Sequence, residues 1–227
     1  MKQVKIVSLK GKKQVSEASS AERGELVTFG GMVSASGQSL PPVYVFPRIK
    51  NMEDLIVNAP LSSLALRNKS GWMTAELFSS VLQHIVKHTR CSLEDPMLLL
   101  VDNHESHISL HSVKFCKESG IVLLSFAPHT THRMQPVDIG VYGPFKNFCS
   151  IAFNDWMVLN PGKTITIKNI PELTHRAYAR AFTNKNIVSS FKKPGIWPFN
   201  RLAFSDDDFD PSYVTDKPFH PAVNPHN

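Results

Sequence analysis

The sequence predicts an α/β fold in which helices flank a mixed β-sheet. The N-terminal third is rich in Val, Ile, Phe and Tyr and is interrupted by Gly, Ser and Pro, which is typical of strands joined by turns. Further along, two short apolar runs at 96–102 and 121–128 are separated by one helical segment. A strand, helix, strand order implies a parallel crossover connection, so part of the sheet is expected to be parallel.

The first half of the chain predicts three strands followed by a long helix. The stretch from Ser36 to Ser39 has the composition of a hairpin-type turn between the second and third strands. Thr74 is a candidate N-cap for the helix, because apolar residues recur after it at three- and four-residue spacing. The strands are expected within residues 4–10, 24–37 and 40–48, and the helix within 70–89.

The second half of the chain predicts alternating strands and helices. The run that begins at Pro96 is apolar up to Asp102, as is typical of a strand that is buried on both faces of a sheet. Gly120 suits the end of the next helix, and Pro136 suits the first position of a later one. The helices are expected within 107–120, 135–157, 170–182 and 186–195, and another buried strand within 121–128.

One domain is expected at residues 1–200, followed by an acidic, proline-rich and disordered tail at 201–227. Residues 205–227 hold five aspartates and one lysine, which leaves 24 basic and 14 acidic residues in 1–204. A basic body in a chain with a pI near 9.2 suits a polyanionic partner.

The composition also excludes several classes of protein. No apolar run approaches the roughly 20 residues that span a bilayer, and no secretory leader pattern opens the chain. We therefore expect neither membrane residence nor secretion. The three cysteines, Cys91, Cys116 and Cys149, lie far apart, are odd in number and form no Cys-x-x-Cys zinc motif. This usage favours a reducing compartment, the cytosol or the nucleus.

Two aspartates follow the predicted strands at the positions where α/β sheets gather their functional groups. Asp102 ends the first buried strand, and Asp138 lies in the first turn of the helix after the second. Strand, helix, strand and loop return the chain to the same sheet edge, so the two carboxylates are expected close together. Such oxygen ligands suit Mg²⁺ or Mn²⁺. Taken singly, each aspartate also fits an ordinary turn or helix-start role.

The segments around these acids resemble the DDE superfamily endonuclease domain of pogo/Tigger/jerky-type transposases, within the wider mariner group. That family has Asp-x-His-x-x-His after a strand, then Pro-His-x-x-His-x-x-Gln-Pro-x-Asp, then Gly-Pro-Phe-Lys. The matching residues are Asp102, His104, His107, Pro128, His129, His132, Gln135, Pro136, Asp138 and Gly143 to Lys146. Other blocks that resemble the family are "SSAERGELVTF", "LPPVYVFPR", "SGWMTAELF" and "GIWPFN", so the resemblance covers about residues 1–200.

The resemblance implies an RNase H-like fold and an Asp-Asp-Asp site that binds two Mg²⁺ or Mn²⁺ ions and cuts and joins DNA. Asp102 would be the second catalytic and metal-binding carboxylate, and Asp138 the third. The implied partner is DNA in the nucleus, with no membrane and no small-molecule substrate, and the family leaves room for a homodimer. His104, His107, His132 and Gln135 are candidates for supporting the carboxylates or facing phosphates.

The family's first aspartate lies on the first strand, in an Asp-Glu-Thr-Gly-like segment that this sequence lacks. We therefore expect a domain without its first strand, with two of three metal-binding aspartates and weak or no cleavage of DNA. Glu25 is a poor candidate substitute. Two alternatives stay open: a domesticated, non-catalytic nuclear DNA-binding or interaction module, and a truncated gene model of an active transposase. An unrelated Mg²⁺ hydrolase would leave the block-by-block resemblance unexplained.

The remaining polar motifs carry less information. His84 and His88, four residues apart, are interpreted as part of a partly exposed helix face rather than as zinc ligands. The short basic clusters at 10–13 and 192–193 fit solvated surfaces as well as phosphate contacts. No individual residue is assigned to nucleic-acid binding.

Overall fold

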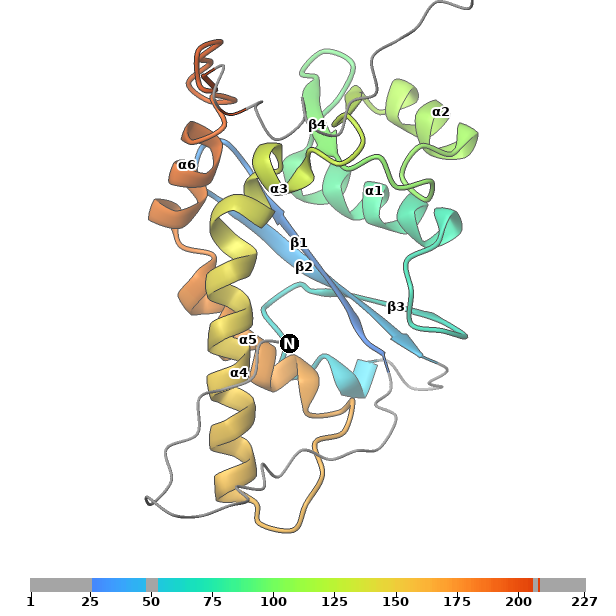
Figure 1. Ribbon diagram of the computed structural model, residues 1–227. Coiled ribbons are helices and arrows are strands. Elements are labelled where there is room, and N and C mark those ends of the chain that lie inside the picture. The colour runs from blue at the N-terminus through green and yellow to red at the C-terminus, as the bar shows by residue number, and fades with distance from the viewer. Residues whose placement is uncertain (1–25, 48–52, 206–207, 209–227) are drawn as a thin grey trace, which may run out of the picture.

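The computed structural model describes residues 26–47, 53–205 and 208, and within them it shows two small β-sheets with helices packed around them (Figure 1). The first sheet has the order β1-β2-β3, with β1 and β2 antiparallel and β2 and β3 parallel. The second sheet is the parallel pair β4-β5. The α/β class and the parallel crossover are thus confirmed, but these strands form two sheets rather than a single mixed one. The strands are β1 (Thr28–Val33), β2 (Ser39–Pro47), β3 (Leu64–Asn68), β4 (Met97–Val101) and β5 (Ile121–Ser125).

The helices follow the predicted periodicity closely. Thr74 caps the first long helix, because its side-chain oxygen accepts a hydrogen bond from the Leu77 N–H at 3.3 Å. Gly120 follows the second helix with φ +73°, a conformation that suits glycine. The helices are α1 (Ala75–Thr89), α2 (Leu110–Glu118), α3 (Thr131–Met134), a π-helix (Val137–Val141) that continues into α4 (Tyr142–Leu159), α5 (Ile170–Ala181) and α6 (Asn184–Lys192).

The sequence did not predict β3 or the short helix α3. It also did not predict a 3₁₀ helix at Glu53–Leu55. The predicted hairpin turn is confirmed, with Gly37 at φ +90° and the Ser34 N–H donating to the Gln38 carbonyl at 2.8 Å. The strand expected at 4–10 lies outside the described residues, as do 206–207 and 209–227 of the expected tail.

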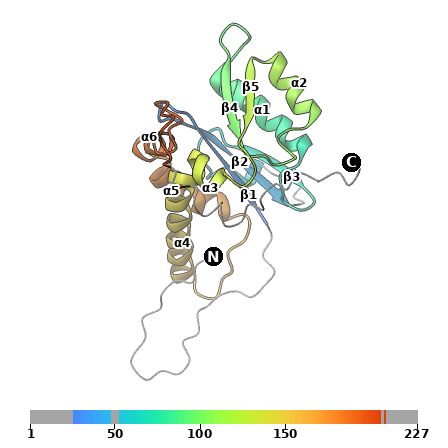
Figure 2. The same ribbon diagram turned by 45° about the horizontal axis from the view of Figure 1, so that its top comes forward.

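Alternation along β2 divides the core into two sides. Val43 and Val45 pack in a cluster with α1, whereas Tyr44 and Phe46 pack in another with Leu55 of the 3₁₀ helix. The α1 cluster also contains Val101 of β4, Ile121 of β5 and Cys116 of α2, so one core joins both sheets. Helices α4 to α6 form a further cluster against β1 (Figure 2).

The second sheet is not buried on both faces, contrary to the prediction from its apolar sequence. Leu98, Val122 and Leu124 are 56%, 58% and 52% exposed. The alternate residues, Leu99 and Leu123, pack against the α1 cluster. A two-stranded sheet therefore has one face covered by helices and one apolar face open to solvent, among the residues that the structure describes. His84 was also interpreted wrongly, because it is only 7% exposed and its Nε2 lies 2.9 Å from the Pro41 carbonyl oxygen.

Gly31 allows β1 to approach the α4–α6 helices closely. A Cβ atom at this position would lie 2.4 Å from Cζ of Phe182. The Phe182 ring has little room to yield, because it stacks on Tyr178 at 4.3 Å and meets Phe145 edge-on at 5.8 Å. The Gly31 N–H also donates to the Tyr142 hydroxyl at 3.0 Å. Glycine at this position is thus a packing requirement.

Gly31→Ala is expected to lower the free energy of unfolding by about 1–3 kcal/mol, the usual cost of overpacking a core. Gly143→Ala is the matched control, because a Cβ at that position in α4 meets nothing within 4 Å. The control is expected to be neutral or stabilising by roughly 0.5–1 kcal/mol, since alanine favours helix. Urea denaturation followed by circular dichroism measures both, and equal effects of the two variants would contradict this account of Gly31.

Candidate functional site

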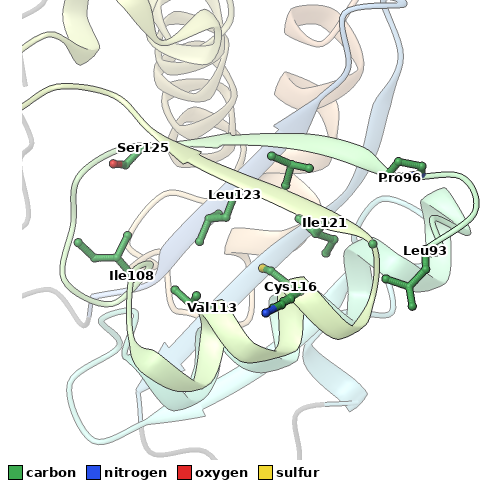
Figure 3. Close-up of a pocket in the computed structure, with 11 residues that line it drawn as sticks. Leu93, Pro96, Ile108, Val113, Cys116, Ile121, Leu123 and Ser125 are labelled. Atoms are coloured by element: carbon green, nitrogen blue, oxygen red, sulfur yellow. The ribbon is translucent and has the colours of Figure 1, made fainter.

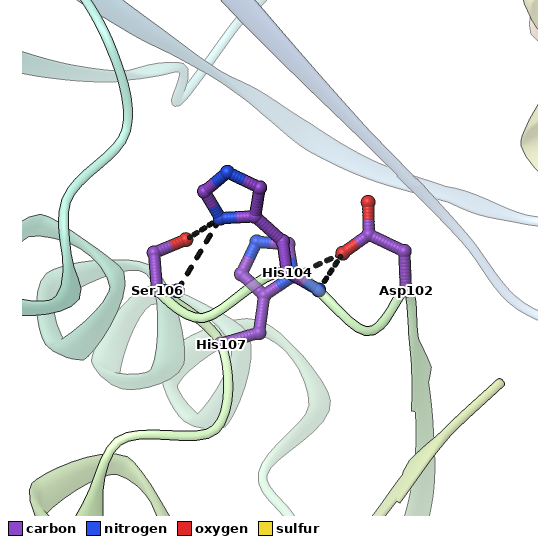
Figure 4. A network of polar contacts seen from close by, with 4 residues as sticks. All are labelled: Asp102, His104, Ser106 and His107. Carbon is purple, nitrogen blue, oxygen red and sulfur yellow. Dashed lines mark hydrogen bonds and ion pairs between the residues drawn. The ribbon is translucent and has the colours of Figure 1, made fainter. Parts of the chain in front are cut away.

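Asp102 is the first residue after β4, at the carboxyl end of the parallel strand pair. Its Oδ1 accepts two hydrogen bonds, from the His104 backbone N–H at 3.2 Å and from His107 Nδ1 at 2.6 Å (Figure 4). Among the described residues, its other oxygen, Oδ2, has no hydrogen-bond partner. One carboxylate oxygen is therefore fixed by the loop, and the other is free to bind a ligand.

The loop that carries the two histidines is anchored to the core and to itself. The His107 ring lies 4.4 Å from the ring of Phe78, a buried residue of α1. Nδ1 of His104 lies 2.8 Å from the Ser106 hydroxyl and accepts the Ser106 backbone N–H at 3.3 Å. His107 thus connects Asp102 to the hydrophobic core, whereas the His104 ring stabilises the turn and does not contact the carboxylate.

Asp138 lies in the π-helix that leads into α4, and its backbone N–H donates to the Gln135 carbonyl at 3.0 Å. The side chain is exposed along part of its surface, yet its pKa is raised. Partial burial is the main cause, Lys146 opposes it, and the negative charge of Asp102 raises the pKa further. The folded chain has therefore brought the two acids within electrostatic reach of each other.

Tyr142 and Lys146, on the first turns of α4, belong to the same neighbourhood. Tyr142 is partly buried, and burial together with the charges of Asp138 and Asp102 raises its pKa to about 12 although the Gly31 N–H opposes this. The tyrosine therefore stays neutral and links β1 to the helix that carries Asp138. The sequence assigned no role to Tyr142, and it placed Lys146 only within the Gly-Pro-Phe-Lys block. The coupling of both residues to the acids emerges from the fold.

His132 and Gln135, also expected to support the carboxylates, form no side-chain hydrogen bond with Asp102 or Asp138 among the described residues. His132 is exposed, and so is His129, which has φ +63°. Gln135 precedes the π-helix, and its buried Oε1 has no hydrogen-bond partner among the described residues. Of the four candidates, only His107 contacts a carboxylate through its side chain.

The two carboxylates fit a divalent cation in part. Asp102 offers a free oxygen, Asp138 is accessible, and neutralisation by a cation would relieve the repulsion between them. Within the described part of the chain, however, no group of three or more acidic, histidine or cysteine side chains is arranged to hold a metal ion. These residues therefore supply two ligands rather than a full set.

A cavity of about 440 Å³ lies away from the carboxylates, between α2 and β5 (Figure 3). Its walls are mostly apolar, with Leu93, Ile108 and Leu123 among them, and they contain no acidic side chain. A cavity of this size often marks a small-molecule site. Here it lacks the convergent polar groups that such sites use, so the carboxylate pair is the better candidate.

Comparison with known proteins agrees with this geometry. The family model described as DDE superfamily endonuclease matches residues 25–191, so the chain belongs to this family. The chain is also similar to a protein of Cochliobolus lunatus named MFS-type transporter clz9, with 32% identity over 183 residues. The match covers 78% of this chain but only 19% of that protein. No helix in the described part of the chain is long and apolar enough to cross a membrane. No solved structure matches the chain.

Membership of this family implies a transposase-like, nucleic-acid-related function. The family generally uses divalent metals and binds DNA.

Asp138→Asn is expected to raise the free energy of unfolding at pH 7 by up to about 1 kcal/mol after solvent screening. The reason is that the charged carboxylate is disfavoured in the folded state, where its pKa is raised. The gain should vanish near pH 3, because the carboxyl is then largely protonated in both the folded and the unfolded chain.

Urea denaturation at both pH values, with a chelator present, measures this difference. Glu118→Gln, which removes an exposed acid at the far end of α2, serves as the control and should change stability little at either pH. An equal or larger gain at pH 3 would show that the charge of Asp138 is not the cause.

Proposed function

We propose that the chain is the endonuclease domain of a pogo/Tigger/jerky-type transposase, with an RNase H-like arrangement, and that it binds DNA in the nucleus. We further propose that these 227 residues cleave DNA weakly or not at all by themselves. The observation that carries the proposal is that Asp102, at the end of a parallel strand pair, lies close enough to Asp138 of the π-helix for its charge to act on that carboxyl. Among the described residues the two acids belong to no group of three or more side chains that could hold a metal ion.

In this proposal the carboxylates provide metal ligands and the surrounding residues fix their geometry. Asp102 would present Oδ2, because His107 and the His104 N–H already occupy Oδ1. Asp138 would present a carboxylate whose charge is partly balanced by Lys146. Divalent ions bound there would supply the activation of a nucleophile and the stabilisation of the leaving oxygen that phosphodiester cleavage needs. The hydrogen bond from His107, whose ring packs on Phe78, would hold the Asp102 carboxylate in one orientation.

A non-catalytic DNA-binding module is the second candidate, and one observation favours it. Two-metal phosphoryl transfer places its ions roughly 3.5–4 Å apart, which requires a ligand that bridges them. The described residues offer two carboxylates and no such third group. The chain spans about a fifth of the length of the curated relative that it matches.

The purified chain is expected to bind duplex DNA with an affinity that falls steeply as salt rises, since phosphate contacts release counterions. In Mg²⁺ or Mn²⁺ it should nick supercoiled plasmid little above the background of an Asp102→Asn variant. Fluorescence anisotropy at low and moderate salt measures the binding, and gel electrophoresis of plasmid measures the nicking.

Each outcome bears on DNA binding or on cleavage. Salt-dependent binding without nicking supports a DNA-binding domain with an incomplete site. Strong nicking that both Asp102→Asn and Asp138→Asn abolish would overturn the expectation of weak cleavage and would locate the third ligand within the 227 residues. Absence of DNA binding even at low salt would refute the proposed function.

A further inference from the structure

Arg133 lies beside the carboxylate site, on the short helix α3. This helix packs against the π-helix that carries Asp138, and Arg133 precedes Asp138 by only five residues. The α3 segment also follows the carboxyl end of β5, which is the end at which Asp102 follows β4. Along the chain, Arg133 thus lies between the carboxyl end of β5 and the π-helix that carries Asp138.

The C-terminal segment covers this guanidinium. Asp208 forms an ion pair with Nη2 of Arg133, and the guanidinium carbon lies 5.4 Å from the centre of the Phe204 ring. Asp208 is itself held in position, because its Oδ2 accepts the backbone N–H of Ser205 at 2.9 Å and the Ser205 hydroxyl at 3.1 Å. Hydrogen bonds from Ser205 and from Arg133 lower the pKa of Asp208, so it is charged at neutral pH. Three residues of one short segment thus organise this contact.

The contact has the chemistry of a phosphate site occupied by a carboxylate. Arginine binds carboxylate and phosphate oxygens through the same planar donors, so either anion can pair with it. The side chains of Arg133 and Asp208 are 40% and 35% exposed, and ion pairs this open to solvent shift an equilibrium by about fivefold at most. A DNA phosphate can therefore replace Asp208 at little cost. The segment around it, Asp206 to Asp210, has four aspartates in five residues.

We propose that Arg133 binds a phosphate of the DNA backbone and that Asp208 occupies it in the free protein, so that the acidic segment competes with DNA. This inference rests on the proposed DNA-binding function and adds to it a named binding residue and a means of restraining it. In the free protein the Asp208 carboxylate neutralises the Arg133 guanidinium, which lowers the attraction of this part of the surface for a polyanion. Release of the segment restores that cation to the DNA path.

The test measures binding of the full chain to a fluorescently labelled duplex of about 20 base pairs, with a chelator present to prevent cleavage. Asp208→Asn is expected to bind about two- to fivefold more tightly than the unmodified chain, because the competing charge is removed. Arg133→Gln is expected to bind more weakly, with the slope of log affinity against log salt reduced by about one. In the Arg133→Gln background, Asp208→Asn is expected to add nothing, since the two residues act through one contact.

Glu118→Gln is the charge control, because it also removes one exposed negative charge but lies at the end of α2, near the start of β5 rather than its carboxyl end. Arg133→Lys provides a second test that preserves the positive charge and removes the planar donors. Thermal unfolding of each variant ensures that binding is compared among equally folded chains.

Each outcome decides the inference. If Asp208→Asn binds no more tightly than Glu118→Gln, or strengthens binding equally without Arg133, the competition is wrong although the chain still binds DNA. If no variant binds the duplex at low salt, the proposed function fails and the inference fails with it. A gain that depends on Arg133 supports both.

Discussion

The hydrogen bond from His107 to Asp102 is the interaction on which the candidate site depends most directly. It joins the Asp102 carboxylate to a ring that packs on Phe78, and Phe78 belongs to the core shared by both sheets. The position of Asp102 is therefore set by its own loop and, through His107, by packing against the hydrophobic core. Because the hydrogen bond uses only Oδ1, the same interaction orients the carboxylate and leaves Oδ2 accessible.

The environment of Asp138, by contrast, lowers the stability of the folded chain. Partial burial is the main cause of the raised pKa of Asp138, and the negative charge of Asp102 raises it further. Lys146 offsets part of this penalty from the next turns of α4. A divalent cation bound between the acids would neutralise both charges and relieve the penalty.

Two features near the site are open to solvent: one face of the β4-β5 pair and the ion pair at Arg133. The β4-β5 pair leaves Leu98, Val122 and Leu124 open to solvent, although its other face joins the main core. Asp208 reaches Arg133 by an exposed ion pair that Ser205 supports, and the Phe204 ring lies over the same guanidinium. Core packing thus positions Asp102 through His107, whereas the ion pair at Arg133 is exposed enough to exchange with another anion.

The sequence alone determined most of the elements, because their signals are local. The cap at Thr74, the turn at Gly37 and the apolar spacing along α1 depend on neighbouring residues, so each could be predicted and is found. The position of Asp102 after a strand and of Asp138 in a first helical turn followed from the same patterns.

Only the tertiary structure decided how these elements meet. An apolar strand reads the same whether one or both of its faces are covered, so the exposed face of β4-β5 was predicted wrongly. His84 was taken for a surface residue because its burial depends on Pro41, 43 residues away in sequence. The coupling of Tyr142 to Asp102 and the pairing of Arg133 with Asp208 likewise join residues far apart in the chain. Local pattern fixes secondary structure, but long-range packing decides which side chains share a site.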